Sequence, residues 1–310
     1  MKFQDTIRTA LQNKDARKFP APDDRRVRNG LLFPTFRPKF AITFDHKLTV
    51  FAIGSCFARN MEDALVVTGT NLPTQAMTAP PSEKKGRANG LLNEFTPGAI
   101  NQRVLSALKD QPLSNGTIVP QKDGYADLLL RTGVTVSLER AQERRVQIDN
   151  IYRELSKSDI VIITLGYVEA WYDQETKLYL NRKPPHTRET VRSDRYIFKR
   201  LTFSESMTLL EPAIDALVQR GLKIILTVSP VPIATTFSGN DCVTANQYSK
   251  SILRTSVGEL SAKANVDYFP SYEIVRSGGL GSYQSDNVHV KDSVVQQVTQ
   301  YMVDAYRSGV

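Results

Sequence analysis

Three continuous apolar runs limit the folds available to this chain more than any other feature. They occupy residues 48–54, 159–166 and 222–229 and are rich in Val, Ile and Leu. A run that stays apolar at successive positions is typical of a parallel strand covered on both faces. Segments with apolar residues three and four positions apart follow these runs, as in amphipathic helices. The alternation predicts a three-layer α/β/α sandwich of the flavodoxin-like kind, with a mostly parallel sheet and loop insertions.

Domain organisation follows from length and composition. The 310 residues suffice for one large domain or two small ones, and 41% hydrophobic residues can fill a sizeable core. Residues 1–44 are polar and contain prolines, and four phenylalanines lie in their final loop (Phe33, Phe36, Phe40 and Phe44). Aromatic side chains in a loop usually pack onto the body of a domain. We therefore expect an N-terminal arm over residues 1–44 that packs on one α/β domain over residues 45–310.

Charge and cysteine content narrow the functional classes. The net charge of +8 would suit an anionic substrate, and so would the basic loop at residues 84–87, although both features also fit a solvated surface. Nucleic-acid binding would rest on net charge alone, since no stacking-aromatic motif accompanies the basic residues, and we expect no nucleic-acid partner. Two cysteines, Cys56 and Cys242, fit a reducing compartment.

The remaining exclusions concern membranes and metals. The first residues form no apolar signal segment, and no run approaches eighteen apolar residues. We therefore expect a cytoplasmic protein without a membrane span. Three histidines and two separated cysteines form no zinc-like cluster, so we expect neither a metal nor a cofactor.

The end of the first apolar run is the candidate position for a nucleophile. The sequence there reads Gly54, Ser55 and Cys56, and it continues as a predicted helix from Phe57 to Val67. Backbone N–H groups at a helix start carry partial positive charge, so they can stabilise a thiolate or an oxyanion. The plainer alternative is an ordinary strand-to-helix turn with Ser55 as the N-cap residue.

Two more positions offer acid–base groups. Asp286 precedes His289 by three residues, just ahead of a helix predicted over residues 293–306. A histidine can take a proton from a nucleophile and return it to the leaving group, while an aspartate fixes its tautomer. After the central apolar run, Glu169 follows Gly166 at the strand edge where α/β sheets place ligands. Glu169 could orient a substrate hydroxyl or act as a base, or it could be a surface or capping carboxylate.

These motifs resemble those of a known family. Residues 54–58 spell Gly-Ser-Cys-Phe-Ala, which matches the signature of the GSCFA family without a substitution. Thr-Leu-Gly and Glu-Ala-Trp within 164–171, Ser-Pro-Val-Pro at 229–232 and Asn-Gln-Tyr-Ser-Lys at 246–250 are similar to the family's later segments. With the Asp-x-x-His pair, the resemblance covers roughly residues 48–306. It implies a relation to the SGNH (GDSL-like) hydrolases.

The resemblance also implies roles for single residues. Aligning the SGNH nucleophile block by its glycine puts Cys56 at the serine, whereas a shift of one residue would make Ser55 the nucleophile. Asp286 and His289 match the last SGNH block. The asparagine of the SGNH oxyanion hole is missing, and Val168 falls at its place. The positions implied for the oxyanion hole or for substrate binding are Gly54, Gly90, Gly166, Glu169 and Asn246.

The activity implied is ester hydrolysis or acyl transfer through a covalent acyl-enzyme. Its partners would be a small-molecule or saccharide substrate carrying O-acyl groups and, for a transferase, an activated acyl donor. The alternative is a non-catalytic ligand-binding protein on the same fold. The missing asparagine favours that alternative, whereas the intact Cys56, Asp286 and His289 argue against it. Trp171, the only tryptophan, is expected to pack rather than to bind.

Overall fold

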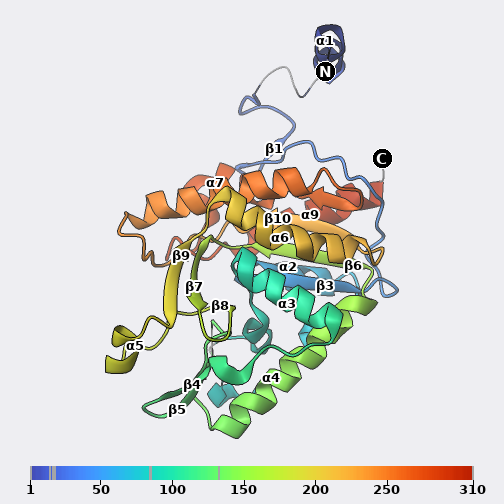
Figure 1. The fold of residues 1–310 in the computed structure, drawn as a ribbon. Helices are drawn as coiled ribbons and strands as arrows, with labels where there is room; N and C mark the ends of the chain where they lie inside the picture. Colours follow the sequence, from blue (N-terminus) through green and yellow to red (C-terminus); the bar gives the residue numbers. More distant parts are fainter. Residues whose placement is uncertain (1, 14, 16–18, 84–85, 132, 309–310) are drawn as a thin grey trace.

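The computed structural model describes residues 2–13, 15, 19–83, 86–131 and 133–308 (Figure 1). The helices are α1 (Phe3–Gln12), α2 (Cys56–Val66), α3 (Pro97–Lys109), α4 (Leu138–Arg153), α5 (Arg188–Arg192), α6 (Phe203–Val218), α7 (Cys242–Leu260), α8 (Ser271–Ser277) and α9 (Asp292–Ser308). The strands are β1 (Val27–Arg28), β2 (Leu31–Leu32), β3 (Val50–Gly54), β4 (Ile118–Gln121), β5 (Gly124–Asp127), β6 (Ile160–Leu165), β7 (Glu169–Asp173), β8 (Leu178–Leu180), β9 (Tyr196–Arg200), β10 (Lys223–Val228) and β11 (Val266–Tyr268).

The central sheet is parallel and has the order β11-β10-β6-β3. Its three long strands are the three apolar runs of the sequence, and they are held in register by pairs such as Gly54 with Thr164 and Val228 with Leu165. An isolated parallel bridge between Thr49 and Asn71 extends the pairing beyond β3. Because the strands are parallel, their carboxyl ends lie at one edge of the sheet.

Helices cover both faces of this sheet, which confirms the predicted three-layer sandwich. Along β3, Phe51 and Ile53 enter the core beneath α3, α4, α6 and α7, while Val50 and Ala52 enter the core beneath α2, α8 and α9. This alternation is the two-residue period of a strand. Both sets are fully buried, which explains why β3 reads as a continuous apolar run rather than as an alternating one.

The excursions between core strands contain antiparallel sheets. One excursion, rich in basic residues, follows β6, and in it β7, β8 and β9 form a three-stranded antiparallel sheet. The polar and aromatic residues of β9 are only half-buried, so its apolar signal is weak. The excursion around residues 111–138 contains the β4–β5 hairpin. Both insertions lie beside the sandwich rather than within it (Figure 1).

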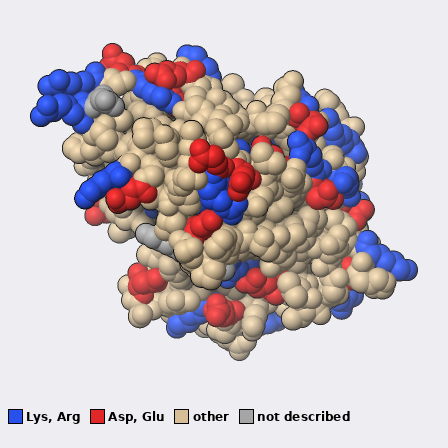
Figure 2. All heavy atoms as spheres, turned by 90° about the horizontal axis from the view of Figure 1, so that it is seen from below, with Lys and Arg blue, Asp and Glu red and all other residues tan. Residues whose placement is uncertain are grey.

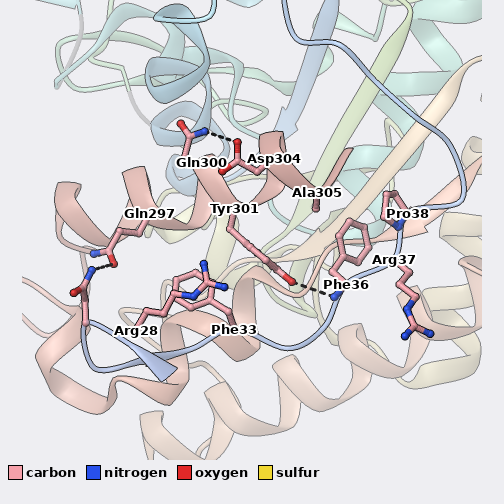
Figure 3. A pocket seen from close by; sticks show the side chains of 11 residues that line it. Arg28, Phe33, Phe36, Arg37, Pro38, Gln297, Gln300, Tyr301, Asp304 and Ala305 are labelled. Atoms are coloured by element: carbon pink, nitrogen blue, oxygen red, sulfur yellow. Dashed lines mark hydrogen bonds between the residues drawn. The ribbon is translucent and has the colours of Figure 1, made fainter. Parts of the chain in front are cut away.

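The N-terminal arm lies along α9. Phe33 and Phe44 are buried, and the rings of Phe36, Phe40 and Phe44 surround Tyr306 at centroid distances of 5.4 to 6.4 Å. A cavity of about 740 Å³ remains between this arm and α9 (Figure 3). Its lining contains none of the residues proposed for catalysis. Helix α1 stands apart from the body of the molecule (Figure 1).

Charged side chains of both signs share the surface. On the face seen in Figure 2, Lys and Arg lie among Asp and Glu, and no single-sign patch spans the residues drawn in colour. Lys84 and Lys85 of the basic loop lie outside the described residues. Arg87 of that loop forms an ion pair with Asp63 of α2, and its Nη1 donates to the carbonyl of Arg59 at 3.0 Å. Arg87 therefore anchors the loop to α2.

Candidate functional site

Three loops meet at the carboxyl edge of the parallel sheet, and side chains hold them together. They follow β3 at Ser55, β6 at Gly166 and β10 at Ser229. The hydroxyl of Ser55 donates to that of Ser229 at 3.0 Å. The ammonium group of Lys250 on α7 donates to the carbonyl oxygens of Gly166 at 2.6 Å and Val231 at 2.8 Å. The site is therefore one connected unit built on rigid strand ends.

Gly54 permits the close approach of β3 and β6 at this edge. Its φ is +144°, and a Cβ there would lie 2.3 Å from the carbonyl oxygen of Thr164. We expect Gly54→Ala to lower the free energy of unfolding by at least about 3 kcal/mol, since it adds backbone strain to overpacking. Urea denaturation followed by circular dichroism would measure this effect.

Gly221→Ala is the matched control for the Gly54 variant. Its φ is also positive, at +78°, but nothing lies within 4 Å of a Cβ placed there. Only the left-handed backbone penalty of about 1–2 kcal/mol should remain. Equal losses in the two variants would show that the contact with Thr164 is unimportant.

Ser55 has the geometry of a structural residue. It is the N-cap of α2, and its Oγ accepts the N–H of Phe57 at 3.3 Å. Its hydroxyl hydrogen is directed to Ser229, and the side chain is 2% exposed. The hydroxyl is thus occupied on both its donor and acceptor sides, as a helix cap requires.

Cys56 is the first residue of α2 and is partly exposed. Burial raises the pKa of its thiol, while hydrogen bonding from the Phe57 N–H, the charge of Lys250 and the charge of Arg87 act in the opposite direction. The sequence led us to expect a readily activated thiol. Desolvation raises the pKa of the thiol by more than the N–H groups at the start of α2 and the nearby charges lower it, so ionisation needs a base or a further positive charge.

Lys250 is a site residue that our sequence reading did not assign. It is fully buried within the apolar stripe of α7 that continues through Leu253 and Val257. Burial lowers its pKa to about 7, and the nearby Cys56 thiol acts in the opposite direction. A single lysine on the buried face of a predicted helix was the available signal, because such lysines are rare without a function.

Asp286 and His289 form the predicted pair. Nδ1 of His289 lies 2.6 Å from Oδ2 of Asp286, and Oδ1 of Asp286 accepts the N–H groups of Val288 and His289. The hydrogen bond from His289, followed by those from the backbone, lowers the pKa of Asp286 to about 2. Nε2 of His289 is left for proton transfer. The side chain is 54% exposed, and among the described residues no hydrogen bond joins it to Cys56.

A tyrosine fixes the loop that carries this pair. Tyr283 forms a bridge with Val290, and its hydroxyl donates to the carbonyl of Pro230 at 3.0 Å. Pro230 follows Ser229, which contacts Ser55. The Asp286–His289 loop therefore lies at the same sheet edge as Cys56.

Three residues implied by the resemblance have other contacts. The N–H of Gly90 donates to the carbonyl of Arg87 at 3.2 Å, so it is not directed at an oxyanion in this structure. Both carboxylate oxygens of Glu169 are engaged, by the hydroxyl of Thr236 and the N–H of Phe237. Oδ1 of Asn246 accepts the N–H of Ile233 at 3.2 Å. Glu169 and Asn246 thus hold the loop after β10.

The sequence model of the GSCFA family matches residues 49–302, most of the chain. The chain belongs to the GSCFA family. A comparison with curated proteins gave no match. A GDSL-like lipase from Bacteroides thetaiotaomicron aligns with 84% of this chain and 88% of its own at 11% identity and a TM-score of 0.38.

An acetylxylan esterase from Geobacillus stearothermophilus, a catalytic mutant, aligns with 86% of this GSCFA chain and 96% of its own. Its identity is 13% and its TM-score is 0.35. Both alignments describe only a partial similarity of the chain trace. The chemistry of the GSCFA protein must therefore be inferred from its own residues.

A cavity of about 250 Å³ lies next to the site of the GSCFA protein. Tyr167 and Glu169, which follow β6, form part of its wall, and so do Ile233 and Phe237 from the loop after β10. Burial, with smaller contributions from Cys56 and Glu169, raises the pKa of Tyr167 to about 12. The ring of Tyr167 stacks on Phe95 at 5.5 Å. Tyr167 is therefore part of the cavity wall and is also near enough to Cys56 to interact with it electrostatically.

The described part of the GSCFA chain contains neither a cluster of metal-ligating side chains nor a helix that could span a membrane. No group of three or more His, Cys, Asp or Glu side chains there could hold a metal ion. No helix among these residues is both long enough and apolar enough to cross a bilayer.

Proposed function

We propose that this GSCFA protein is an acyl-ester hydrolase in which the thiol of Cys56 attacks the ester carbonyl. The observation that carries the proposal is the position of Cys56 at the N-terminus of α2, at the carboxyl edge of the parallel sheet, beside buried Lys250. Ser55, the alternative nucleophile, is occupied by capping α2 and by Ser229. The N–H groups at the start of α2 would stabilise the developing oxyanion.

The proposed reaction has two steps. In the first, a bond forms between Cys56 Sγ and the acyl carbon, the ester C–O bond breaks, and the thiol proton passes through a base to the departing alcohol. In the second, water attacks the thioester, the carboxylic acid leaves, and Cys56 recovers its proton. An alcohol in place of water would make the same acyl-enzyme an acyltransferase. We propose saccharide O-acyl groups as the substrate class, because the SGNH enzymes that the sequence resembles often act on them.

His289 is the proposed proton carrier, with Asp286 fixing its tautomer. Hydrogen bonds between catalytic groups are often long or absent before substrate binds. The imidazole of His289 is 54% exposed and would turn toward Cys56 when the ester lies between them. Lys250 is the proposed source of positive charge that favours the thiolate.

We expect wild-type protein treated with 4-nitrophenyl acetate to carry one acetyl group on Cys56. His289→Ala should slow formation and loss of this group by roughly 10²–10⁴-fold, because it removes the general acid–base. Mass spectrometry of quenched digests would follow the acetylated peptide over time. His186→Ala is the matched control, since His186 is exposed and lies in the loop between β8 and α5.

Two observations favour a non-catalytic ligand-binding protein as the second candidate. Burial raises the pKa of Cys56, and no hydrogen bond joins Cys56 to His289 in the described structure. A protein of that kind would bind small ligands without forming an acyl-enzyme. Absence of the acetyl group from Cys56, with alkylation no faster than that of a free thiol, would favour this candidate over the hydrolase.

A further inference from the structure

The 250 Å³ cavity beside Cys56 combines aromatic walls with uncompensated positive charge. Trp171 contacts Phe198 at 5.5 Å and Phe237 at 5.4 Å between ring centroids, and all three rings line the cavity. The sequence led us to expect that Trp171 only packs. It packs and also lines the cavity, and its indole Nε1–H is buried without a hydrogen-bond partner. A flat, largely apolar group would fit against such walls.

Three cationic side chains line the same cavity: Arg131, Arg182 and Lys183. Among the described residues, none of them forms an ion pair or a hydrogen bond. Burial and then the charge of Arg131 lower the pKa of Arg182, while Asp127 acts weakly against this. Asp127 is itself paired with Arg145 at 2.9 Å. Arg131 and Lys183 are exposed, whereas Arg182 is half-buried, so Arg182 is the cation whose unpartnered charge is least solvated and best placed to serve a ligand.

Glu169 is the carboxylate among the described residues of the cavity wall, and its single negative charge stands against three cations. Its two oxygens accept hydrogen bonds from Thr236 and Phe237. The cavity lining therefore keeps an excess of positive charge. Arginine guanidinium groups recognise carboxylates and phosphates through paired N–H donors.

We propose that this cavity binds a carboxylate or phosphate attached to a flat apolar group, and that this anion is part of the ester substrate. The assignment as a substrate subsite rests on the proposed hydrolase function. Occupation of the cavity by an anion does not depend on catalysis. An ester anchored there would extend its reacting carbonyl past Tyr167 toward Cys56, because Tyr167 lines the cavity and interacts electrostatically with Cys56. The net charge of +8 would also draw anionic substrates toward the protein.

The single tryptophan makes binding directly measurable, because fluorescence excited at wavelengths that tyrosine does not absorb reports on Trp171 alone. Phenyl phosphate and benzoate are the anionic probes, and benzyl alcohol is the neutral one. We expect a saturable fluorescence change with at least one anion, a weaker response at high salt, and none with benzyl alcohol at equal concentration. Stronger binding of phenyl phosphate would indicate a phosphate ligand, and stronger binding of benzoate a carboxylate.

Arg182→Gln and Arg131→Gln should each weaken binding of the preferred anion by about tenfold or more, because each removes a charge-assisted contact. Arg307→Gln, at the exposed end of α9, removes the same charge elsewhere and should not change binding. Thermal unfolding shows whether weaker binding comes from a lost contact or from a misfolded protein. Removing the unpartnered charge of Arg182 should leave the melting temperature unchanged or raise it. A response equal for anions and benzyl alcohol, or unaffected by both cavity variants, would overturn the proposal.

Cys56→Ala separates this inference from the proposed function. Anion binding that persists in Cys56→Ala supports the cavity assignment whatever the fate of the hydrolase proposal. Acetylation of Cys56 without any anion-dependent fluorescence change would instead leave the hydrolase intact and refute the anion site.

Discussion

Cys56→Ala is expected to reduce hydrolysis of 4-nitrophenyl acetate by at least about 10³-fold, because it removes the atom that forms the acyl-enzyme. Ser55→Ala should act differently. It removes the cap of α2 and one of the two hydrogen bonds that the buried hydroxyl oxygen of Ser229 accepts, so the free energy of unfolding should fall by about 1–3 kcal/mol. Initial rates and urea denaturation of both variants would separate chemistry from stability.

The comparison of these two variants decides which residue attacks. A Cys56→Ala protein that keeps a tenth or more of the activity, beside an inactive but folded Ser55→Ala protein, would make Ser55 the nucleophile. Cys242→Ser is the control for loss of a thiol outside the site, because the Cys242 Sγ donates to the carbonyl of Ile233, as a hydroxyl can. Its activity should stay close to that of the wild type.

Removing the positive charge of Lys250 should be the second large effect. In a Cys242→Ser background, where Cys56 is the remaining thiol, we expect Lys250→Met to slow alkylation by iodoacetamide about tenfold at pH 7. The reason is that Lys250 lowers the pKa of Cys56 against the effect of burial. The difference should shrink toward pH 10, where the thiol ionises in both proteins. Rates measured across pH give the apparent pKa of each thiol.

Arg87→Gln is the comparison variant and should slow alkylation less than Lys250→Met does, because Arg87 lowers the pKa of Cys56 less than Lys250 does. Lys250→Gln keeps an N–H donor near the carbonyls of Gly166 and Val231, and so controls for the loss of those hydrogen bonds. If both Lys250 variants fold and alkylate as fast as the background protein, Lys250 does not activate the thiol.

The same lysine makes stability depend on pH. Its pKa is about 7 in the folded protein and about 10.4 in an unfolded chain. Between pH 6 and 8 the unfolded state therefore holds more protons at this group, so the free energy of unfolding contributed by Lys250 rises with pH. Lys250→Met should flatten this rise. Urea midpoints at pH 6 and pH 8 for both proteins would test the expectation.

The parallel sandwich could be predicted because its strands are buried on both faces. Such strands must be apolar at every position, and that pattern is visible without any knowledge of the neighbours. The antiparallel sheet of β7, β8 and β9 could not be predicted in the same way. Its residues pair with one another across a half-buried surface, and cross-strand pairing leaves a weak trace in a local window.

The sequence also determined which chemical groups gather at the carboxyl edge of the sheet, because parallel strands bring their ends together. The Asp286–His289 pair forms as its three-residue spacing indicated. Tertiary structure alone decided what surrounds Cys56. The hydrogen bond from Ser55 to Ser229 joins residues 174 positions apart, and that from Lys250 to Gly166 joins residues 84 positions apart. The charged aromatic cavity likewise combines separate segments of the chain. Hydrogen bonding, desolvation and electrostatic coupling depend on distances in space, and those distances are set only when the chain has packed.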